Sequence, residues 1–153
     1  MYKIFDIANW FLQKEFMDQK KVQKLCYYAQ AWHLALFDKP MMNCEFEAWA
    51  HGPVCRELWN ELHPFSYFDI PRDKLKSQAV VITTASDLEF MERVWETYGE
   101  FSGYQLEVLT HKESPWINAR GGIPEFQKCT SVISNDDMKN YYKTLYTGDG
   151  IGE

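Results

Sequence analysis

The stretch from Lys21 to Val54 constrains the fold of this chain more than any other part of its sequence. Wound at about 3.6 residues per turn, its first half puts a run of apolar residues on one face and Tyr27 and Leu34 on the opposite side. The residues of the first face are Val22, Leu25, Cys26, Ala29, Trp32, His33 and Leu36, flanked by Tyr28 and Phe37. A helix that is apolar nearly all round is buried in its domain. We therefore expect a central scaffold helix over residues 19–37, and not an active site.

The length of 153 residues and a hydrophobic fraction of 46% are typical of one globular domain. We expect this domain to span residues 1–147 and residues 148–153 to form a mobile tail. The net charge of −6 is uneven, since residues 76–153 hold seven Lys and Arg against twelve Asp and Glu. The chain lacks the clustered cations that bind a nucleic-acid backbone, so we expect no nucleic-acid partner, and a basic protein partner instead.

The chain shows neither a secretory leader at its N-terminus nor an apolar run of 18 residues, so we expect no contact with a membrane. Its four cysteines stand far apart, with no paired spacing. Thiols of this kind in a non-secreted chain are most simply reduced core residues, which predicts a cytoplasmic protein.

The turn and capping residues predict a mainly α fold, a single helical domain around the buried central helix with a small two-stranded β element. Expected helix caps are Asp6, Asp18, Ser86 with Glu89, Ser102 with Gln105, and Ser134 with Asp137. The helices following these caps should end near residues 17, 37, 98, 112 and 146. Pro53 suits the first position of a helix to residue 62, and Ser114-Pro115 begins a short turn. Residues 79–83 are β-branched and could pair with residues 45–50.

Two groups of side chains could hold zinc, and neither has a complete ligand pattern. Cys44, His51, Cys55 and His63 are suitable ligand types, but structural zinc sites usually take pairs of ligands two to four residues apart. His111 and Glu113 form the His-x-Glu of zinc deaminases without the downstream pair of cysteines. We therefore expect no metal, no cofactor and no zinc-dependent hydrolase or deaminase activity, although the last remains the enzymatic alternative.

A cysteine nucleophile is a further catalytic possibility, because Cys26 and His33 share one helical face. Seven residues along a helix separate them by about 10 Å, too far for direct proton transfer. An apolar face also keeps a thiol inert. The chain has no phosphate-binding loop or nucleophile elbow either. We expect no catalytic residue and no enzymatic activity.

The most pronounced surface pattern is acidic. Four glutamates form a stripe on the helix that follows Ser86: Glu89, Glu92, Glu96 and Glu100. Like charges four residues apart cost a few tenths of a kcal/mol per pair, so the stripe is either an ordinary solvated face or a docking surface for a basic partner. Lys21 and Lys24 lie in the first turns of the central helix, where the helix dipole disfavours cations. Internal carboxylates or a partner should offset them, which makes both lysines further candidates for partner binding.

Three separated motifs occur in order: VQKLCYYAQAWHLALFDKP, FEAWAHGPV and LEVLTHKESPW. Together they resemble the Panacea domain of the SocA-like antitoxin family, which is also found in phage-associated proteins, over roughly residues 4 to 145. The motif residues that we expect to be structural are Leu25, Tyr28, Ala29, Trp32, Trp49, Gly52, Pro53, Val54, His111, Pro115 and Trp116. The chain departs from the family at Asp38, where glycine is frequent, at Cys26 and at Ala50.

The resemblance implies a helical fold and the antitoxin role in a toxin–antitoxin pair. Members of this family neutralise diverse protein toxins by direct contact, which implies a toxin partner, most simply encoded by the adjacent gene. One branch of the family delivers its toxin to a cytoplasmic AAA+ protease, and this adaptor role is the alternative.

Overall fold

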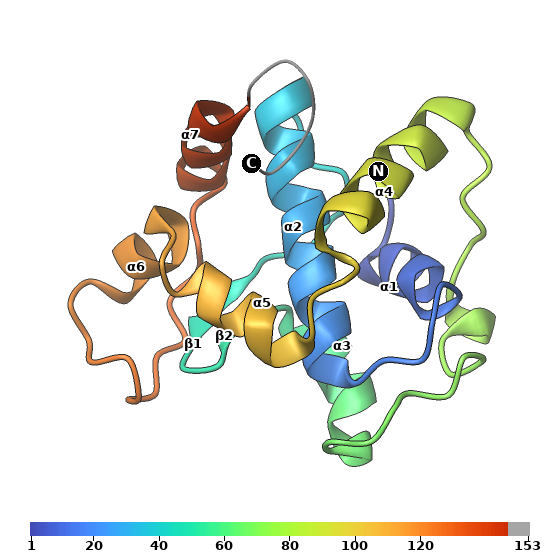
Figure 1. The fold of residues 1–153 in the computed structure, drawn as a ribbon, viewed down its shortest axis with the longest axis horizontal. Helices are drawn as coiled ribbons and strands as arrows, with labels where there is room; N and C mark the ends of the chain where they lie inside the picture. The colour runs from blue at the N-terminus through green and yellow to red at the C-terminus, as the bar shows by residue number, and fades with distance from the viewer. Residues whose placement is uncertain (147–153) are drawn as a thin grey trace.

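The computed structural model describes residues 1–146, so the predicted tail over residues 148–153 lies outside the described residues. The chain folds into helices around a central one, with a two-stranded antiparallel sheet at one side (Figure 1). The helices are α1 (Ile4–Leu12), α2 (Gln19–Phe37), α3 (Arg56–Leu62), α4 (Ala85–Tyr98), α5 (Gly103–Thr110), α6 (Ser114–Arg120) and α7 (Asn135–Leu145). Two short 3-10 helices are η1 (His63–Phe65) and η2 (Lys76–Gln78), and the strands are β1 (Glu47–Trp49) and β2 (Gly52–Val54). The predicted fold class is confirmed.

Helix α2 occupies the middle of the molecule, with α1 and α4 on one side and α6 and α7 on the other (Figure 1). Every residue from Lys21 to Ala35 is buried, the apolar ones as predicted and the polar residues Lys21, Gln23, Lys24 and Gln30 in addition. Asp18 caps the helix by accepting a hydrogen bond from the backbone N–H of Lys21 at 2.9 Å. At the other end, Asp38 adopts the left-handed conformation with φ of 60°, which explains why glycine suits this position.

The side chains of two buried glutamines on α2 form hydrogen bonds with the backbones of neighbouring loops. The side-chain oxygen of Gln23 accepts a bond from the N–H of Cys55 at 2.9 Å, and its amide group donates to the carbonyl of Cys55 at 3.0 Å. Gln30 accepts from the N–H groups of Met41 and Met42 at 2.9 and 3.1 Å and donates to the carbonyl of Met42 at 2.9 Å. Both side chains thereby pair buried backbone groups of these loops, among them the N–H groups of Met41, Met42 and Cys55.

The sheet differs from the expected one. Strand β1 pairs with β2, which follows it directly, and not with residues 79–83. Pro53 therefore lies in β2, and α3 begins only at Arg56. Residues 79–83 have no regular structure, and Val80 and Val81 are exposed, at 63% and 73%. This segment contacts α1 instead, where Val80 donates its backbone N–H to the carboxylate of Asp6 at 2.7 Å.

Other helix limits also differ from the expected ones. Helix α1 begins at Ile4 and ends at Leu12, because Asp6 accepts the backbone N–H of Lys3 from inside the first turn and does not precede the helix. Helix α4 begins at Ala85, so Ser86 lies within it and forms no capping box. Helix α6 runs from Ser114 to Arg120 and ends before Gly121, as expected. The predicted caps at Ser102 and Ser134 are both formed.

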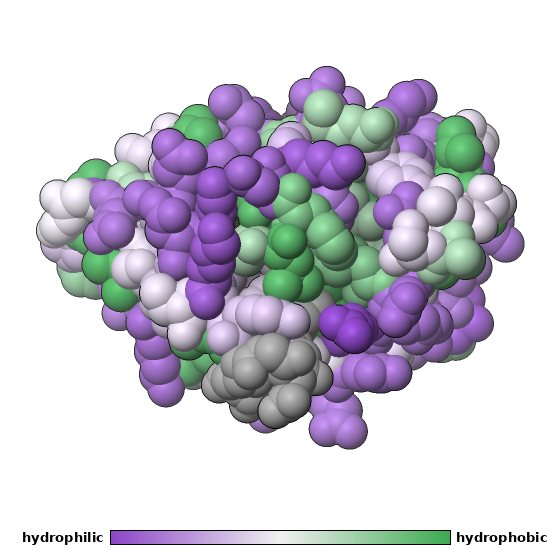
Figure 2. Space-filling view, turned by 90° about the horizontal axis from the view of Figure 1, so that it is seen from above, coloured by the Kyte–Doolittle hydropathy of each residue, from purple (hydrophilic) through white to green (hydrophobic). Residues whose placement is uncertain are grey.

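The core is rich in aromatic rings packed on α2. Tyr28 stacks on Tyr98 with 4.0 Å between ring centroids, and the indole N–H of Trp32 donates to the hydroxyl of Tyr98 at 2.8 Å. Not all apolar groups are internal: Phe37, the last residue of α2, is 51% exposed. Figure 2 shows a group of apolar residues between hydrophilic ones at the end of the molecule toward which α2 runs. No helix within residues 1–146 is long and apolar enough to cross a membrane.

Candidate functional site

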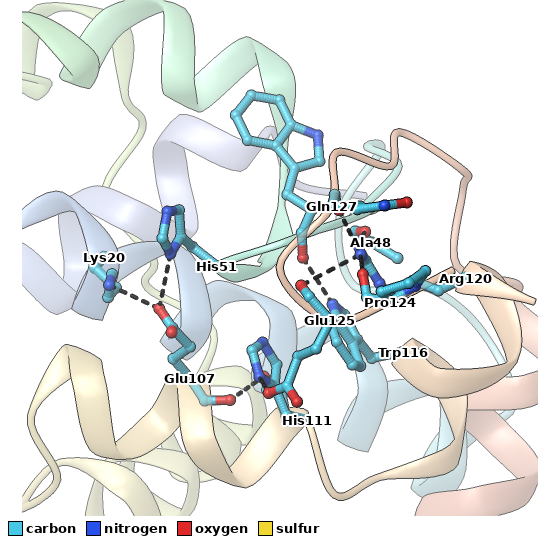
Figure 3. Close-up of polar contacts among 12 residues, drawn as sticks. Lys20, Ala48, His51, Glu107, His111, Trp116, Arg120, Pro124, Glu125 and Gln127 are labelled. Atoms are coloured by element: carbon cyan, nitrogen blue, oxygen red, sulfur yellow. Dashed lines mark hydrogen bonds and ion pairs between the residues drawn. The ribbon is translucent and has the colours of Figure 1, made fainter. Parts of the chain in front are cut away.

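The second and third sequence motifs meet at the β1–β2 hairpin. The indole N–H of Trp116 donates to the carbonyl of Trp49 at 2.9 Å, and the ring of His111 stacks on Trp116 at 4.0 Å (Figure 3). The guanidinium of Arg120 donates to the carbonyl of Ala48 at 2.8 Å and to carbonyls of the loop after α6, among them Pro124 at 2.7 Å. These contacts join α6 to the hairpin.

The carboxylate of Glu107 on α5 connects the hairpin to α2. It forms an ion pair with Lys20 at 2.7 Å and lies 3.5 Å from the Nδ1 of His51, which stands in the turn between the strands (Figure 3). The ammonium of Lys20 and the imidazole of His51 lower the pKa of Glu107 against the effect of its partial burial. The positive charge of Lys20 in the first turn of α2 is thus neutralised by the carboxylate of Glu107.

A cavity of about 510 Å³ opens beside this ion pair, and Lys24 forms part of its wall. Only 1% of Lys24 is exposed, and its ammonium forms no hydrogen bond or ion pair with any of residues 1–146. Burial lowers the pKa of this lysine to about 7. Aromatic rings make up much of the remaining wall: Trp49, Trp59, His63, Tyr67 and Tyr104. A volume of this size is ordinary for a small-molecule site.

Gly52 in β2 allows this arrangement. Its φ of +100° is a conformation that side-chain-bearing residues rarely adopt, and a Cβ at this position would lie 2.6 Å from the Cε of Lys24. The glycine of the HGPV motif is therefore required both by its own backbone and by the buried lysine that packs against it.

Glu113 is another buried titratable group, and it lies among aromatic hydroxyls. The hydroxyls of Tyr28 and Tyr142 each donate to its Oε1 at 2.7 Å, so the carboxyl group joins α2 to α7. Burial raises the pKa of Glu113 to about 7, although the two hydrogen bonds oppose the shift. The side chain of His111 points elsewhere, to Glu125. The His-x-Glu pair is therefore divided between two environments and does not form one deaminase-like site.

The four glutamates of the predicted stripe lie on the outer side of α4 and just beyond its end. Glu89, Glu96 and Glu100 are exposed and form no ion pair with any of residues 1–146. Glu92 is half-buried and pairs with Lys14 of the segment after α1. Glu96 and Glu100 also line a recess of about 410 Å³ together with Glu15 and the ring of Trp95.

Both lysines that sequence reasoning considered for partner binding are buried. The ammonium of Lys21 forms an ion pair with Glu15 at 2.8 Å and donates to the carbonyl of Gly99 at 2.6 Å, which joins α2 to the segment between α4 and α5. Lys24 reaches only the cavity. The cations in the first turns of α2 are thus explained by internal contacts for Lys20 and Lys21, whereas Lys24 stays without a partner among residues 1–146.

The other candidate residues do not assemble. Within the described part of the chain, no three His, Cys, Asp or Glu side chains are placed to hold a metal ion together. Cys44 and Cys55 are free thiols that contact each other, and this contact raises the pKa of Cys44 and lowers that of Cys55. His33 is bound through Nδ1 to the carbonyl of Lys39 at 2.7 Å.

Sequence reasoning missed the cavity and the buried Glu113. The only signal for the cavity was an uncompensated lysine within an otherwise apolar helix, together with the aromatic residues Trp49 and Trp59 close by in sequence. For Glu113 the sequence held no signal, because its tyrosine partners come from helices far apart along the chain.

Comparison with known proteins gives one family. The family model described as antitoxin SocA-like, Panacea domain, matches residues 22–117. Antitoxin SocA of Caulobacter vibrioides (strain NA1000 / CB15N) is 30% identical over 112 residues, which cover 62% of this chain and 55% of that protein. The chain thus spans about half the length of this curated relative. No solved structure matches the chain with significance.

Proposed function

We propose that this chain, which belongs to the family of SocA-like antitoxins with a Panacea domain, is an antitoxin that neutralises a protein toxin by binding it directly. The toxin is most simply the product of the adjacent gene, and the two proteins meet in the cytoplasm. The proposed role involves no catalytic step, no cofactor and no nucleic acid. It needs only a surface that a toxin recognises.

The observation that carries the proposed interface is the unpaired acidic surface of α4. Glu89, Glu96 and Glu100 are exposed and form no ion pair with any cation among residues 1–146, and Glu96 and Glu100 are four residues apart. Like charges four residues apart repel by a few tenths of a kcal/mol. A basic surface of the toxin would remove this repulsion, and complementary charge speeds association as well as selecting the partner.

The recess next to this stripe supports the same chemistry. Glu96 and Glu100 line this recess with the ring of Trp95, while Glu15 is paired with Lys21, whose ammonium lies 5.3 Å from the centroid of the Trp95 ring. An aromatic face with carboxylates around it suits a guanidinium or an ammonium group. We therefore assign an arginine or lysine of the toxin to this recess. Lys21 and Lys24 are left out of the proposed surface, because both are buried.

The test is co-expression of the chain with the product of the adjacent gene. We expect that product to be toxic alone, to be harmless beside this chain, and to co-purify with it. Replacing Glu89, Glu96 and Glu100 by glutamine should weaken the complex by about tenfold or more, with most of the loss at low salt. Thermal stability should stay equal or rise slightly, because like-charge pairs are removed.

The matched control changes the same charge elsewhere. Glu45, Glu57 and Asp69 are exposed, lie outside the stripe, and form no ion pair with residues 1–146. Their replacement by Gln, Gln and Asn shifts the net charge equally and should leave the affinity within about twofold. An equal loss of affinity in both triple variants would refute a local interface on α4. A harmless neighbour that forms no complex would refute the antitoxin role in this gene pair.

Masking of the toxin and its delivery to a AAA+ protease differ in one measurable quantity, the half-life of the toxin. Direct neutralisation predicts that the half-life is the same in cells with and without the protease. A toxin that becomes long-lived only when the protease is deleted would assign this chain to the adaptor role.

A further inference from the structure

The cavity beside the β1–β2 hairpin shares no residue with the acidic stripe and has no part in the proposed toxin contact. It lies where α2, the hairpin, α3 with the segment after it, and α5 come together, and its volume of about 510 Å³ is within the range of small-molecule sites. Its most unusual constituent is a lysine, because lysine is rarely buried unless it is paired.

Lys24 is held in place by its surroundings and still lacks a counter-ion. Its Cε packs against the backbone of Gly52, so the side chain has little room to swing out to solvent. The carboxylate of Glu107 forms its ion pair with Lys20, and Asp18 accepts the backbone N–H of Lys21. Lys24 is 99% buried and lines the cavity without a counter-ion. Burial of its ammonium destabilises the folded chain, and an anion bound in the cavity would offset this desolvation cost.

A second polar group of the cavity wall is also unsatisfied. The side-chain oxygen of Gln19 is buried without a hydrogen-bond partner among residues 1–146, while its amide group donates to the carbonyl of Ser66 at 3.2 Å. The cavity wall thus holds one unpaired cation, Lys24, and one unsatisfied hydrogen-bond acceptor, the side-chain oxygen of Gln19. A ligand that satisfies both carries an anionic group and an N–H or O–H donor.

The remaining wall selects for an aromatic ring. Trp49 and Trp59 meet edge to face at 5.5 Å, and His63 stacks on Trp59 at 4.2 Å. Tyr67 and Tyr104 line the same space and are 92% and 67% exposed. Exposed aromatic rings around a cavity gain free energy when another ring covers them.

The charge balance favours a single negative charge. Lys20 is neutralised by Glu107, and the carboxylates of Glu107 and Asp18 stay close to the cavity. Lys24 therefore supplies one positive charge. The second negative charge of a dianion would have no cation to pair with and would be repelled by the carboxylates of Glu107 and Asp18. A carboxylate fits this balance better than a phosphate monoester.

From these observations we propose that the cavity is a binding site for a small aromatic monocarboxylate, whose carboxylate pairs with the Lys24 ammonium and whose donor group reaches the side-chain oxygen of Gln19. The ring lies against the tryptophans and tyrosines of the wall. This site is independent of the proposed toxin contact, since it can be occupied in the chain alone.

Binding should take up protons. The pKa of Lys24 near 7 leaves about half of the amine uncharged at neutral pH, and a bound carboxylate favours its charged form. The other charged and titratable groups that face the cavity are Asp18 and Lys20 on α2, His51 in the hairpin turn, His63 on η1, Tyr67 after it, Tyr104 on α5 and the Glu107 carboxylate next to Lys20. The Lys24→Met variant separates the proton that Lys24 takes up from any contribution of these groups.

The experiment is a calorimetric titration of the purified full chain with N-acetyl-L-tryptophan, which carries a carboxylate, an amide N–H and an indole ring. N-acetyl-L-tryptophanamide, which lacks only the charge, is the matched control ligand. We expect the acid to bind at least about tenfold more tightly than the amide, with uptake of about half a proton at pH 7 measured in two buffers. Lys24→Met should abolish this preference and the proton uptake.

A second variant covers the case in which Lys24→Met does not fold. Tyr104 is exposed, so Tyr104→Ser should leave the fold intact, as circular dichroism can verify, and should weaken binding of the acid severalfold. Equal affinity for acid and amide, no binding of the acid at millimolar concentration, or unchanged binding in Lys24→Met would overturn the proposal. Much tighter binding of a peptide that ends in tryptophan would overturn its assignment to a small molecule.

Discussion

Glu113 gives this fold a pH-dependent stability that one substitution should remove. In the folded chain its pKa is raised from 4.5 to about 7, chiefly by burial. Between these two values the folded state holds a proton that the unfolded state has released. Stability therefore falls as pH rises through this window, by about 1.4 kcal/mol per pH unit. The total over the window is about 3 kcal/mol, a large share of the stability of a small domain.

Glutamine at this position keeps an oxygen that can accept the hydroxyls of Tyr28 and Tyr142, but it has no proton to lose. We expect Glu113→Gln to lose the slope between pH 5 and pH 8. Its stability relative to the natural chain should rise across this range by about 3 kcal/mol. Any constant cost of the amide group affects all pH values equally, so the change with pH is the decisive quantity.

The assay is urea unfolding at pH 5, 6, 7 and 8, followed by tryptophan fluorescence, for the natural chain, Glu113→Gln and Glu45→Gln. Glu45 is exposed and serves as the control for a lost carboxylate, so its variant should keep the natural slope. If Glu113→Gln shows the same pH dependence as the natural chain, the buried carboxyl does not titrate near 7 and the reasoning is wrong.

Three further predictions concern the same core. Lys24, whose pKa is lowered to about 7 in the folded chain, should make stability rise between pH 7 and pH 10.5, and Lys24→Met should flatten this limb of a urea-unfolding profile. Gly52→Ala should cost about 1–3 kcal/mol, because φ is +100° and the new Cβ would meet the Cε of Lys24; a thermal midpoint equal to that of the natural chain would contradict the argument. Gln30→Ala leaves two backbone N–H groups unpaired and should cost at least about 2 kcal/mol in the same urea assay. Gln13→Ala, at an exposed position, should cost less than about 1 kcal/mol, and equal losses would argue against the role of Gln30.

The parts of the fold that sequence reasoning recovered depend on nearby residues. The burial of α2 follows from its own apolar pattern, and the caps at Asp18, Ser102 and Ser134 need only a side chain and an N–H three residues on. The failures depend on distant parts of the chain. Residues 79–83 could have paired with β1 only at a free edge, and both edges of β1 are taken, one by β2 and the other by residues 131–132.

The candidate site shows the same division. The exposed positions of Glu89 and Glu96 follow from helical periodicity, since the opposite face of α4 packs inward, whereas Glu100 lies beyond the end of the helix. The burial of Lys24 could not be predicted, because it results from the approach of Gly52 to α2 and from the engagement of Glu107 with a different lysine. The residue type shows which chemistry a position can perform, but its burial depends on which distant segments pack against it.

The two glutamines of α2 have a consequence for how this scaffold can diversify. Gln23 and Gln30 grip the adjoining loops by main-chain groups, which every amino acid other than proline presents alike. Side chains in those loops can be exchanged over generations, or by design, while the loops keep their course. A domain of this kind can therefore acquire new binding partners through substitutions in its loops while it keeps its fold.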